Sequence, residues 1–230
     1  MIHRSLAILL LSVLTAAPLC AGDPGDQWFT DRHFDFTVMG TETSFSGQDR
    51  FMGIYDTQLK FSSATGVRAE LSYARSRYFR FGLAVGMDRP SLSIKASPYY
   101  FSGAQVRVGT AQRLTTAFEF SVHPIRDERF DLYVGLGVEK TTYSVSEDGS
   151  LAALGLTDVS LHGSVRPAIR FGGLYIFTKH MALRGELRYA SASGTSEVTL
   201  GAPFTTLPVR TSSTISHAAV HLGLGMTFRF

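Results

Sequence analysis

Charged side chains recur at every second position in several otherwise apolar segments of this sequence. Arg184, Glu186 and Arg188, for example, are separated by single uncharged residues. Because successive side chains of a β-strand point to opposite faces, this spacing gathers the charges on one face. Opposite charges on such a face neutralise one another as ion pairs. We therefore predict a charge network inside a β-barrel, made of seven arginines, four glutamates and one aspartate: Arg68, Glu70, Arg80, Asp88, Glu119, Glu139, Arg166, Arg170, Arg184, Glu186, Arg188 and Arg229.

Catalytic chemistry has little support in the residue pattern. Apart from His3-Arg4-Ser5 at the N-terminus, His162-Gly163-Ser164 is the one His-x-Ser pair. Strand alternation places both of its side chains on the inner face, but no acidic residue stands in an orienting position. The other histidines, such as His123 and His221, lack metal-ligand spacing. There is no glycine-rich phosphate loop. We predict no catalytic residues, no metal and no cofactor, and we expect that the protein is not an enzyme.

Eight segments with alternating apolar and polar residues can position the charges. They begin at Phe34 and end with the run from Val220 to Phe230, in which every second residue is apolar. That run has the length of a tilted strand that crosses a bilayer, about 9–11 residues. The eight predicted strands are 34–38, 67–73, 79–88, 114–122, 130–139, 161–175, 181–189 and 220–230.

The connections between these segments alternate between long and short. This pattern is typical of an outer-membrane barrel with four long outer loops, three short periplasmic turns and both ends in the periplasm. The fold class that we predict is all-β: an eight-stranded antiparallel up-and-down transmembrane β-barrel, whose interior side chains can fill. A soluble barrel or sandwich is the alternative. The Gly and Ala residues on the second face favour the membrane barrel, because they suit a cramped lumen better than a solvated surface. Within the first long connection, Phe51 to Phe61 is partly apolar and could extend a strand beyond the membrane.

The N-terminus has the features of a targeting segment. His3 and Arg4 precede an apolar stretch from Leu6 to Leu14, and Cys20 lies at a plausible processing site. We predict a signal peptide over 1–22, a periplasmic lead-in over 23–32 and the barrel over 33–230, in the outer membrane of a Gram-negative bacterium. Lipidation of Cys20 is the alternative to its removal. The formal net charge of +3 is too small to indicate nucleic acid binding.

Several stretches resemble the outer-membrane protein W (OmpW) family. The most specific runs from Arg129 to Tyr143 and contains Y-V-G-L-G-V, with further matches at Val108-Gly109-Thr110, Leu174 to Tyr189 and Leu222 to Phe230. Lys179-His180-Met181 departs from the family, which usually carries a tryptophan there; the one Trp of this chain is Trp28.

The resemblance implies an eight-stranded barrel whose outer half forms a narrow hydrophobic pocket for small apolar molecules. It also implies that Phe228 and Phe230 form a terminus read by the outer-membrane assembly machinery. The other partners we expect are outer-membrane lipid, lipopolysaccharide and a small hydrophobic solute.

These observations predict a barrel that binds or passes small hydrophobic molecules through a narrow pocket with lateral release, since the charged lumen blocks a direct path. The alternative is a structural or adhesive outer-membrane barrel whose extracellular loops bind external partners. The Ser, Thr and Gly content of the long connections suits an exposed, adaptable surface.

Overall fold

The computed structural model describes residues 32–46, 49–50, 58–95, 105–127, 129–147, 158–191, 194–200, 209–215 and 218–230. The predicted signal peptide over 1–22, the possible lipidation site Cys20, and nearly all of the lead-in over 23–32 lie outside these residues. No helix within the described ranges is long and apolar enough to cross a membrane.

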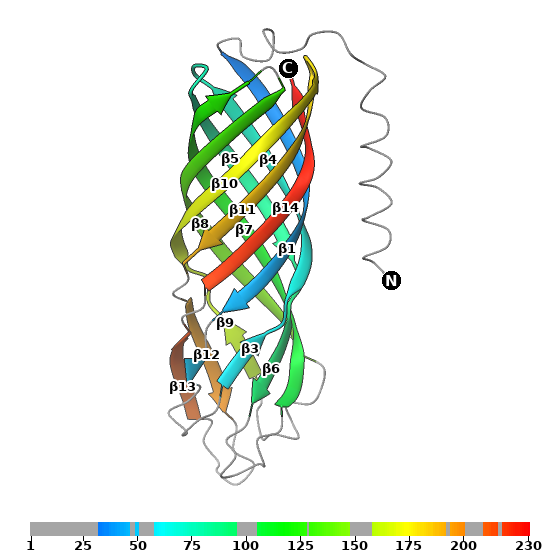
Figure 1. Ribbon diagram of the computed structural model, residues 1–230. Helices are drawn as coiled ribbons and strands as arrows, with labels where there is room; N and C mark the ends of the chain where they lie inside the picture. Colours follow the sequence, from blue (N-terminus) through cyan, green and yellow to red (C-terminus); the bar gives the residue numbers. More distant parts are fainter. Residues whose placement is uncertain are drawn as a thin grey trace, which may run out of the picture.

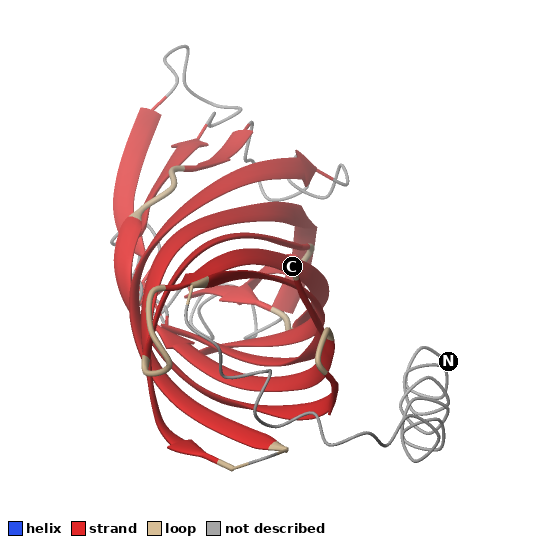
Figure 2. Cartoon of the chain, turned by 90° about the horizontal axis from the view of Figure 1, so that it is seen from above, coloured by secondary structure: helices blue, strands red, loops and turns tan. Residues whose placement is uncertain are grey.

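Eight tilted strands close into a single barrel (Figures 1 and 2). Neighbouring strands are antiparallel, and pairing between β7 and β8 completes the ring. The predicted fold class is therefore confirmed. The barrel strands are β1 (His33–Ser46), β4 (Ala64–Ala74), β5 (Phe79–Asp88), β7 (Gln105–Arg126), β8 (Phe130–Glu147), β10 (Val165–Thr178), β11 (Met181–Ala190) and β14 (Ala218–Arg229).

The C-terminal strand β14 links the first barrel strand to the strand that precedes β14 in the ring. It pairs with β1 on one side and with β11 on the other. At its end, the backbone N–H of Phe230 donates a hydrogen bond to the carbonyl oxygen of Phe34 over 3.0 Å. Both edges of β14 are thus satisfied, as a strand in lipid requires.

The outer surface of the barrel is apolar and the inner surface is polar. On β5, Leu83 is 63% exposed whereas its neighbour Ala84 is 3% exposed, and the same alternation is present on β14 from Ala219 to Gly223. A soluble barrel would bury the leucines and expose the charges. The opposite arrangement confirms the predicted outward register of the apolar faces.

Short turns gather at the end of the barrel that carries the C-terminus (Figure 1). They fall at Arg75–Tyr78, at residues 127–129 and at Lys179–His180. The longer connections lie at the opposite end, which is therefore the outer side.

The outer end contains more strands than the sequence predicts. β2 (Asp49–Arg50), β3 (Gln58–Phe61) and β6 (Ser91–Lys95) extend the barrel sheet, while β9 (Asp158–Leu161), β12 (Gly194–Leu200) and β13 (Val209–Ile215) form a second sheet. Three expectations are corrected. β7 begins at Gln105, before the predicted strand 114–122; two strands, β12 and β13, lie between the predicted strands 181–189 and 220–230; and Leu161, the predicted start of strand 161–175, belongs to β9. Beyond the bilayer no apolar face is required, so the period-two pattern fades although the strands still pair.

A charge on the lipid face of β14 tests this register. We expect Leu224→Arg to lower the free energy of unfolding in lipid by about 2–4 kcal/mol, because a guanidinium then lies in the hydrocarbon layer. Denaturant titration of the refolded protein in vesicles measures this change. Leu224→Ala is the control, and equal stability of the two variants would contradict the outward orientation of Leu224.

Candidate functional site in the barrel lumen

The lumen holds an extensive set of buried charges. All twelve residues of the predicted charge network are buried, and each makes at least one ion pair. Asp35, Arg113 and Asp131 join them, so that the described buried residues include eight arginines and seven carboxylates. We refer to these fifteen residues as the lumen charge network.

Two arginines in the middle of the barrel each bridge two carboxylates. Arg170 Nη1 lies 2.9 Å from Glu70 Oε2 and 2.6 Å from Glu119 Oε2. Arg184 Nη2 lies 2.9 Å from Glu70 Oε2 and 2.6 Å from Glu186 Oε2. Because β4, β7, β10 and β11 supply these residues, the ion pairs tie strands from different sides of the barrel together.

Tyr133 adds a hydroxyl to the same layer. Its O–H donates to Glu186 over 2.6 Å and accepts a hydrogen bond from Arg184 Nε over 2.6 Å. The Tyr133 ring lies directly over Gly172 of the neighbouring strand, where a Cβ would overlap the ring. Gly172 therefore makes the space that this aromatic ring occupies inside the lumen.

The next layer toward the outside is richer in arginine. Arg166 and Arg188 both hold Glu139. Arg188 Nη2 also lies 3.1 Å from Glu119 Oε1, which Arg68 contacts over 2.6 Å. Glu139 thus serves two arginines at once.

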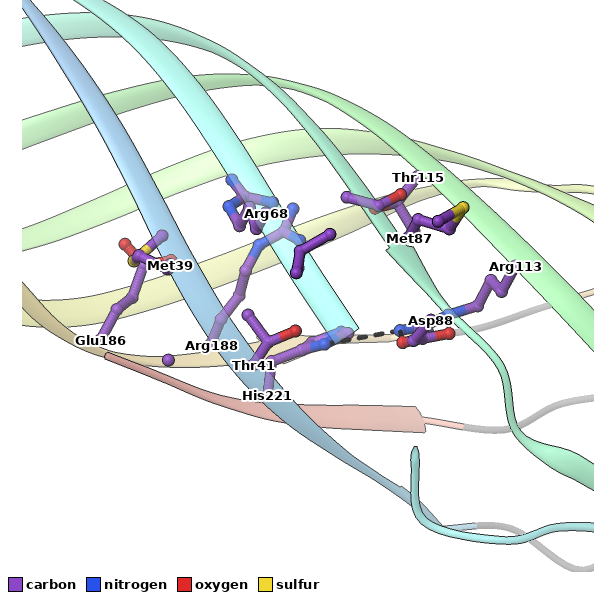
Figure 3. Close-up of a pocket in the computed structure, with 13 residues that line it drawn as sticks. Met39, Thr41, Arg68, Met87, Asp88, Arg113, Thr115, Glu186, Arg188 and His221 are labelled. Carbon is purple, nitrogen blue, oxygen red and sulfur yellow. Dashed lines mark hydrogen bonds and ion pairs between the residues drawn. The ribbon is translucent and has the colours of Figure 1, made fainter. Parts of the chain in front are cut away.

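The outermost layer is a hydrogen-bonded group around Asp88. Arg113 contacts Asp88 with both Nε and Nη2, and the Thr43 hydroxyl donates to Asp88 over 2.9 Å. His221 reaches from β14 toward this group, with Nδ1 at 2.9 Å from Thr43 Oγ1 (Figure 3). Beside it lies a cavity of about 20 Å³, lined among others by Arg68, Arg113, Arg188 and His221.

The periplasmic end of the lumen is closed by a smaller group. Arg80 lies 3.1 Å from Asp35 and 3.2 Å from Asp131, so it bridges β1 and β8. Arg229 Nε lies 3.0 Å from Asp35. These contacts fasten the last residues of β14 to the first residues of β1.

Three residues in this periplasmic group have the geometry of a Ser–His–Asp relay. Ser121 Oγ lies 3.1 Å from His123 Nε2, and His123 Nδ1 lies 2.7 Å from Asp131 Oδ1. A hydrolase with this relay must expose its nucleophile to substrate. Ser121 is only 2% exposed, and Asp131 is also held by Arg80. In this conformation the relay is a hydrogen-bonded part of the lumen packing.

The predicted inward orientation of His162-Gly163-Ser164 is wrong. These residues lie outside the barrel strands, between β9 and β10, and His162 is exposed. The chain leaves the regular ladder here, so strand alternation does not fix which way the side chains point.

Several lumen residues were missing from the prediction. Asp35 and Asp131 stand between large apolar residues, so the period-two pattern could have identified them. Arg113 falls just outside the predicted strand, which begins at Leu114. Tyr133 belongs to a predicted strand, but a single tyrosine gives no sign of its polar partners.

Pairing is what makes these buried charges tolerable. Removing one partner of a buried ion pair typically costs about 3–5 kcal/mol, because the other charge stays behind without compensation. The carboxylates of the lumen charge network lie within ion-pair distance of arginines from other strands. The network therefore fixes the relative positions of the barrel strands and fills the space between them.

Comparison with solved structures relates this arrangement to known proteins. The crystal structure of the outer-membrane protein OprG from Pseudomonas aeruginosa superposes with a TM-score of 0.73, at 14% identity over 89% of this chain and 98% of OprG. The solid-state NMR structure of outer-membrane protein AlkL in lipid bilayers gives 0.63, at 19% identity over 88% and 92%. The crystal structure of Neisserial surface protein A gives 0.51, at 14% identity over 86% and 97%.

The chain has the fold of the OprG and AlkL barrels. No protein-family model and no curated protein sequence matches it. The resemblance to the OmpW family is thus confirmed at the level of the fold, since OprG and AlkL are eight-stranded barrels of the OmpW/OprG family. The apolar outer surface, the charged interior and the similarity of fold to outer-membrane barrels agree with the predicted outer-membrane location.

Glu139 is the most informative position for testing the network. We expect Glu139→Gln to lower the free energy of unfolding by roughly 3–5 kcal/mol, because Arg166 and Arg188 both lose a carboxylate in a buried layer. Urea titration in lipid vesicles provides the measurement. Glu42→Gln makes the same change on an exposed residue of β1; if it costs as much as Glu139→Gln, the network does not stabilise the barrel.

Proposed function

We propose that this protein is an outer-membrane barrel that takes up small hydrophobic molecules in its outer half and releases them sideways into the membrane. Three features support the proposal: an aromatic cluster in the outer lumen, a charged layer below it, and a weakly paired section of the barrel wall. The first two define where an apolar solute can stay, and the third defines where it leaves.

The aromatic cluster consists of Phe45, Phe61 and Tyr143. The ring centroids of Phe45 and Phe61 are 5.4 Å apart, and those of Phe61 and Tyr143 are 6.0 Å apart. Since Phe45 belongs to β1 and Tyr143 to β8, the cluster spans the lumen between opposite walls. It offers an apolar surface inside the barrel, above the charged layers.

The lumen charge network forms the floor beneath this cluster. Arg113 marks the boundary, because its guanidinium lies 4.9 Å from the Phe45 ring centroid while its nitrogen atoms hold Asp88. An apolar solute gains nothing by moving from the rings into the ion pairs, since it would have to separate charges that are already buried. Passage straight through to the periplasm is therefore unfavourable.

The cavity in the upper layers of the floor is small. At about 20 Å³ it has the size of one water molecule, and no ring of the aromatic cluster is among its lining residues. A larger solute is accommodated by displacement of the aromatic rings, of which Phe61 lies on the short strand β3 at the outer rim.

A break in the barrel wall lies at the outer end of β10. The ladder between β8 and β10 ends at the pair Lys140 and Val165, although β8 continues to Glu147. One further hydrogen bond joins the Thr141 N–H to the carbonyl oxygen of Ser164. Above this point no ladder joins β10 to β8, and β9 pairs with β12 in the second sheet.

Gly163 makes this departure possible. A Cβ at position 163 would overlap the carbonyl oxygen of Thr141, so a glycine is required for the chain to cross so close to β8. The other edge of β10 is also weak. The Ser191 N–H donates to the carbonyl oxygen of Pro167 over 3.2 Å, and Pro167 has no N–H with which to return the bond.

The single observation that carries the proposal is this combination of an aromatic lumen, a closed charged floor and a wall that loses its hydrogen bonds at the same outer end. The end of the β8–β10 ladder just above the floor supports lateral release. We propose further that Phe228 and the exposed Phe230 serve recognition by the assembly machinery, and that the lipid face meets lipopolysaccharide and phospholipid.

A charge in the aromatic cluster should block uptake. We expect Phe61→Asp to abolish protein-dependent uptake of a small apolar solute, because a carboxylate replaces the central ring. Uptake is measured in asymmetric vesicles with lipopolysaccharide in the outer leaflet, where the lipid alone is a poor entry route. Ser62→Asp is the matched control on the adjacent exposed residue.

Equal uptake with and without the native protein would contradict the proposal. Normal uptake by Phe61→Asp, together with lost surface binding after deletion of the outer loops, would favour the structural or adhesive alternative.

Strengthening the wall should slow release. Pro167→Thr supplies the missing N–H toward Ser191, and we expect it to reduce the rate of solute transfer into the membrane at least several-fold while binding is retained. Val165→Thr changes another outward residue of the same strand without adding a hydrogen-bond donor to the backbone. Stopped-flow transfer of a fluorescent apolar probe measures the rate, and identical rates for both variants would rule out exit at this section of wall.

A further inference from the structure

The lumen contains one more buried positive charge than negative charge, and this excess belongs to one layer of the charge network. Among the described buried residues the eight arginines outnumber the seven carboxylates by one. The periplasmic group pairs Arg80 and Arg229 with Asp35 and Asp131. In the layer above the middle of the barrel, by contrast, Arg166 and Arg188 share Glu139. The surplus positive charge therefore resides just below the aromatic cluster.

Arg188 is the arginine that the network can spare. Of its carboxylate partners, Glu139 keeps Arg166, and Glu119 keeps Arg68 and Arg170. Arg113 differs, because its loss would leave Asp88 without its arginine. Arg113 is therefore needed to neutralise Asp88. Arg188 is not needed in this way, because every carboxylate that it contacts has another arginine partner.

Donor atoms of both arginines are left without a hydrogen bond at the same cavity. Arg188 Nε and Arg113 Nη1 are buried and make no hydrogen bond within the described part of the chain, and both residues line the cavity of about 20 Å³ (Figure 3). Buried donors of this kind are costly unless a ligand or water satisfies them. The two arginines are 3% and 1% exposed, so bulk solvent does not reach them freely.

The carboxylates at this cavity are already occupied. Asp88 is held by Arg113 and Thr43, and Glu186 by Arg184 and Tyr133. The Thr43 hydroxyl donates to Asp88, so the contact between His221 Nδ1 and Thr43 Oγ1 is a donation from Nδ1–H. The arginine donors at the cavity that make no hydrogen bond within the described residues therefore include Arg113 Nη1 and Arg188 Nε, with Arg68 Nε beside them.

We propose that this cavity binds the carboxylate group of an amphipathic monocarboxylic acid, whose apolar tail packs on Phe45, Phe61 and Tyr143. The cavity has room for one water-sized group, such as a carboxylate oxygen. Arg113 connects the two parts of the site, since the guanidinium that lines the cavity also stacks on Phe45 at 4.9 Å. This assignment rests on the proposed function and narrows its substrates from apolar molecules in general to those with an anionic head.

Paired ligands separate this inference from the proposed function. Octanoate and 1-octanol have the same chain length, and at pH 8 octanoate is ionised. Binding is measured by calorimetry with the full-length mature protein in lipid nanodiscs, with empty nanodiscs subtracted to remove partition into lipid. We expect octanoate to bind native protein roughly tenfold or more tightly than 1-octanol, in line with a hydrogen bond to a charged group.

Two arginine variants locate the anion. Arg188→Gln removes a donor from the cavity, and we expect the preference for octanoate to fall to about one. Arg166→Gln removes the same charge from the same partner, Glu139, but from a residue that is not among those lining the cavity. It should keep the preference. The carboxyl ¹³C resonance of labelled octanoate should shift on binding to native protein and to Arg166→Gln, and not to Arg188→Gln.

Each other outcome has a distinct meaning. Equal binding of octanoate and 1-octanol by native protein overturns the carboxylate site and leaves the proposed function intact. An equal loss of preference in both variants overturns the assignment to this cavity, because the overall charge of the lumen would then explain it. If neither ligand binds native protein, the proposed function fails together with the inference. Thermal unfolding of both variants verifies that the barrel remains folded.

Discussion

Arginine–carboxylate pairing inside a narrow barrel is the interaction on which the rest of this structure depends. An eight-stranded barrel has an interior that side chains fill, so charges placed there must meet one another. In the middle of the barrel Arg170 of β10 and Arg184 of β11 share Glu70 of β4. Arg170 also pairs with Glu119 of β7, and Arg184 with Glu186 on its own strand. These pairs join strands across the lumen, whereas the backbone ladders join only neighbours. The outer surface can then be largely apolar, because the interior holds the barrel together.

The same pairing divides the lumen into two parts with different chemistry. Below Arg113 the interior consists of ion pairs, and above it lie the rings of Phe45, Phe61 and Tyr143. The wall follows this division. β8 and β10 remain paired alongside the charged layers, and their ladder ends at Lys140 and Val165, near the level at which the aromatic cluster begins. The ion pairs of the floor and the end of the β8–β10 ladder lie at neighbouring levels of the barrel. Together they favour lateral movement of an apolar solute.

Much of the barrel could be predicted from the sequence, because one physical rule governs each membrane strand. Lipid outside and charge inside impose a period of two, which located all eight strands and twelve of the fifteen residues of the lumen charge network. The rule loses force beyond the bilayer. The start of β7 at Gln105, and with it the inward position of Arg113, depends on pairing with β6 and β8 and leaves no apolar signature.

The departures at the candidate site have a similar cause. The break at Gly163 depends on contact with Thr141, which is distant in sequence, and the relay of Ser121, His123 and Asp131 requires two strands in register. The surplus arginine could not be recognised before the partners of each charge were known. Sequence patterns place side chains on a face; the pairing of strands decides which of them meet.

The central claim is that an apolar solute occupies the outer lumen and leaves through the wall without crossing the charged floor. Paramagnetic relaxation in nanodiscs tests it directly, with a nitroxide-bearing apolar solute compared with a nitroxide fixed in the lipid. The account predicts that the solute, beyond the effect of the lipid label, broadens the backbone amide signals of Phe45, Phe61 and Tyr143 and those of Lys140 to Thr142, and leaves His123 and Asp131 sharp. Broadening that extends down the lumen to His123 and Asp131, or that matches the lipid label everywhere, would contradict it.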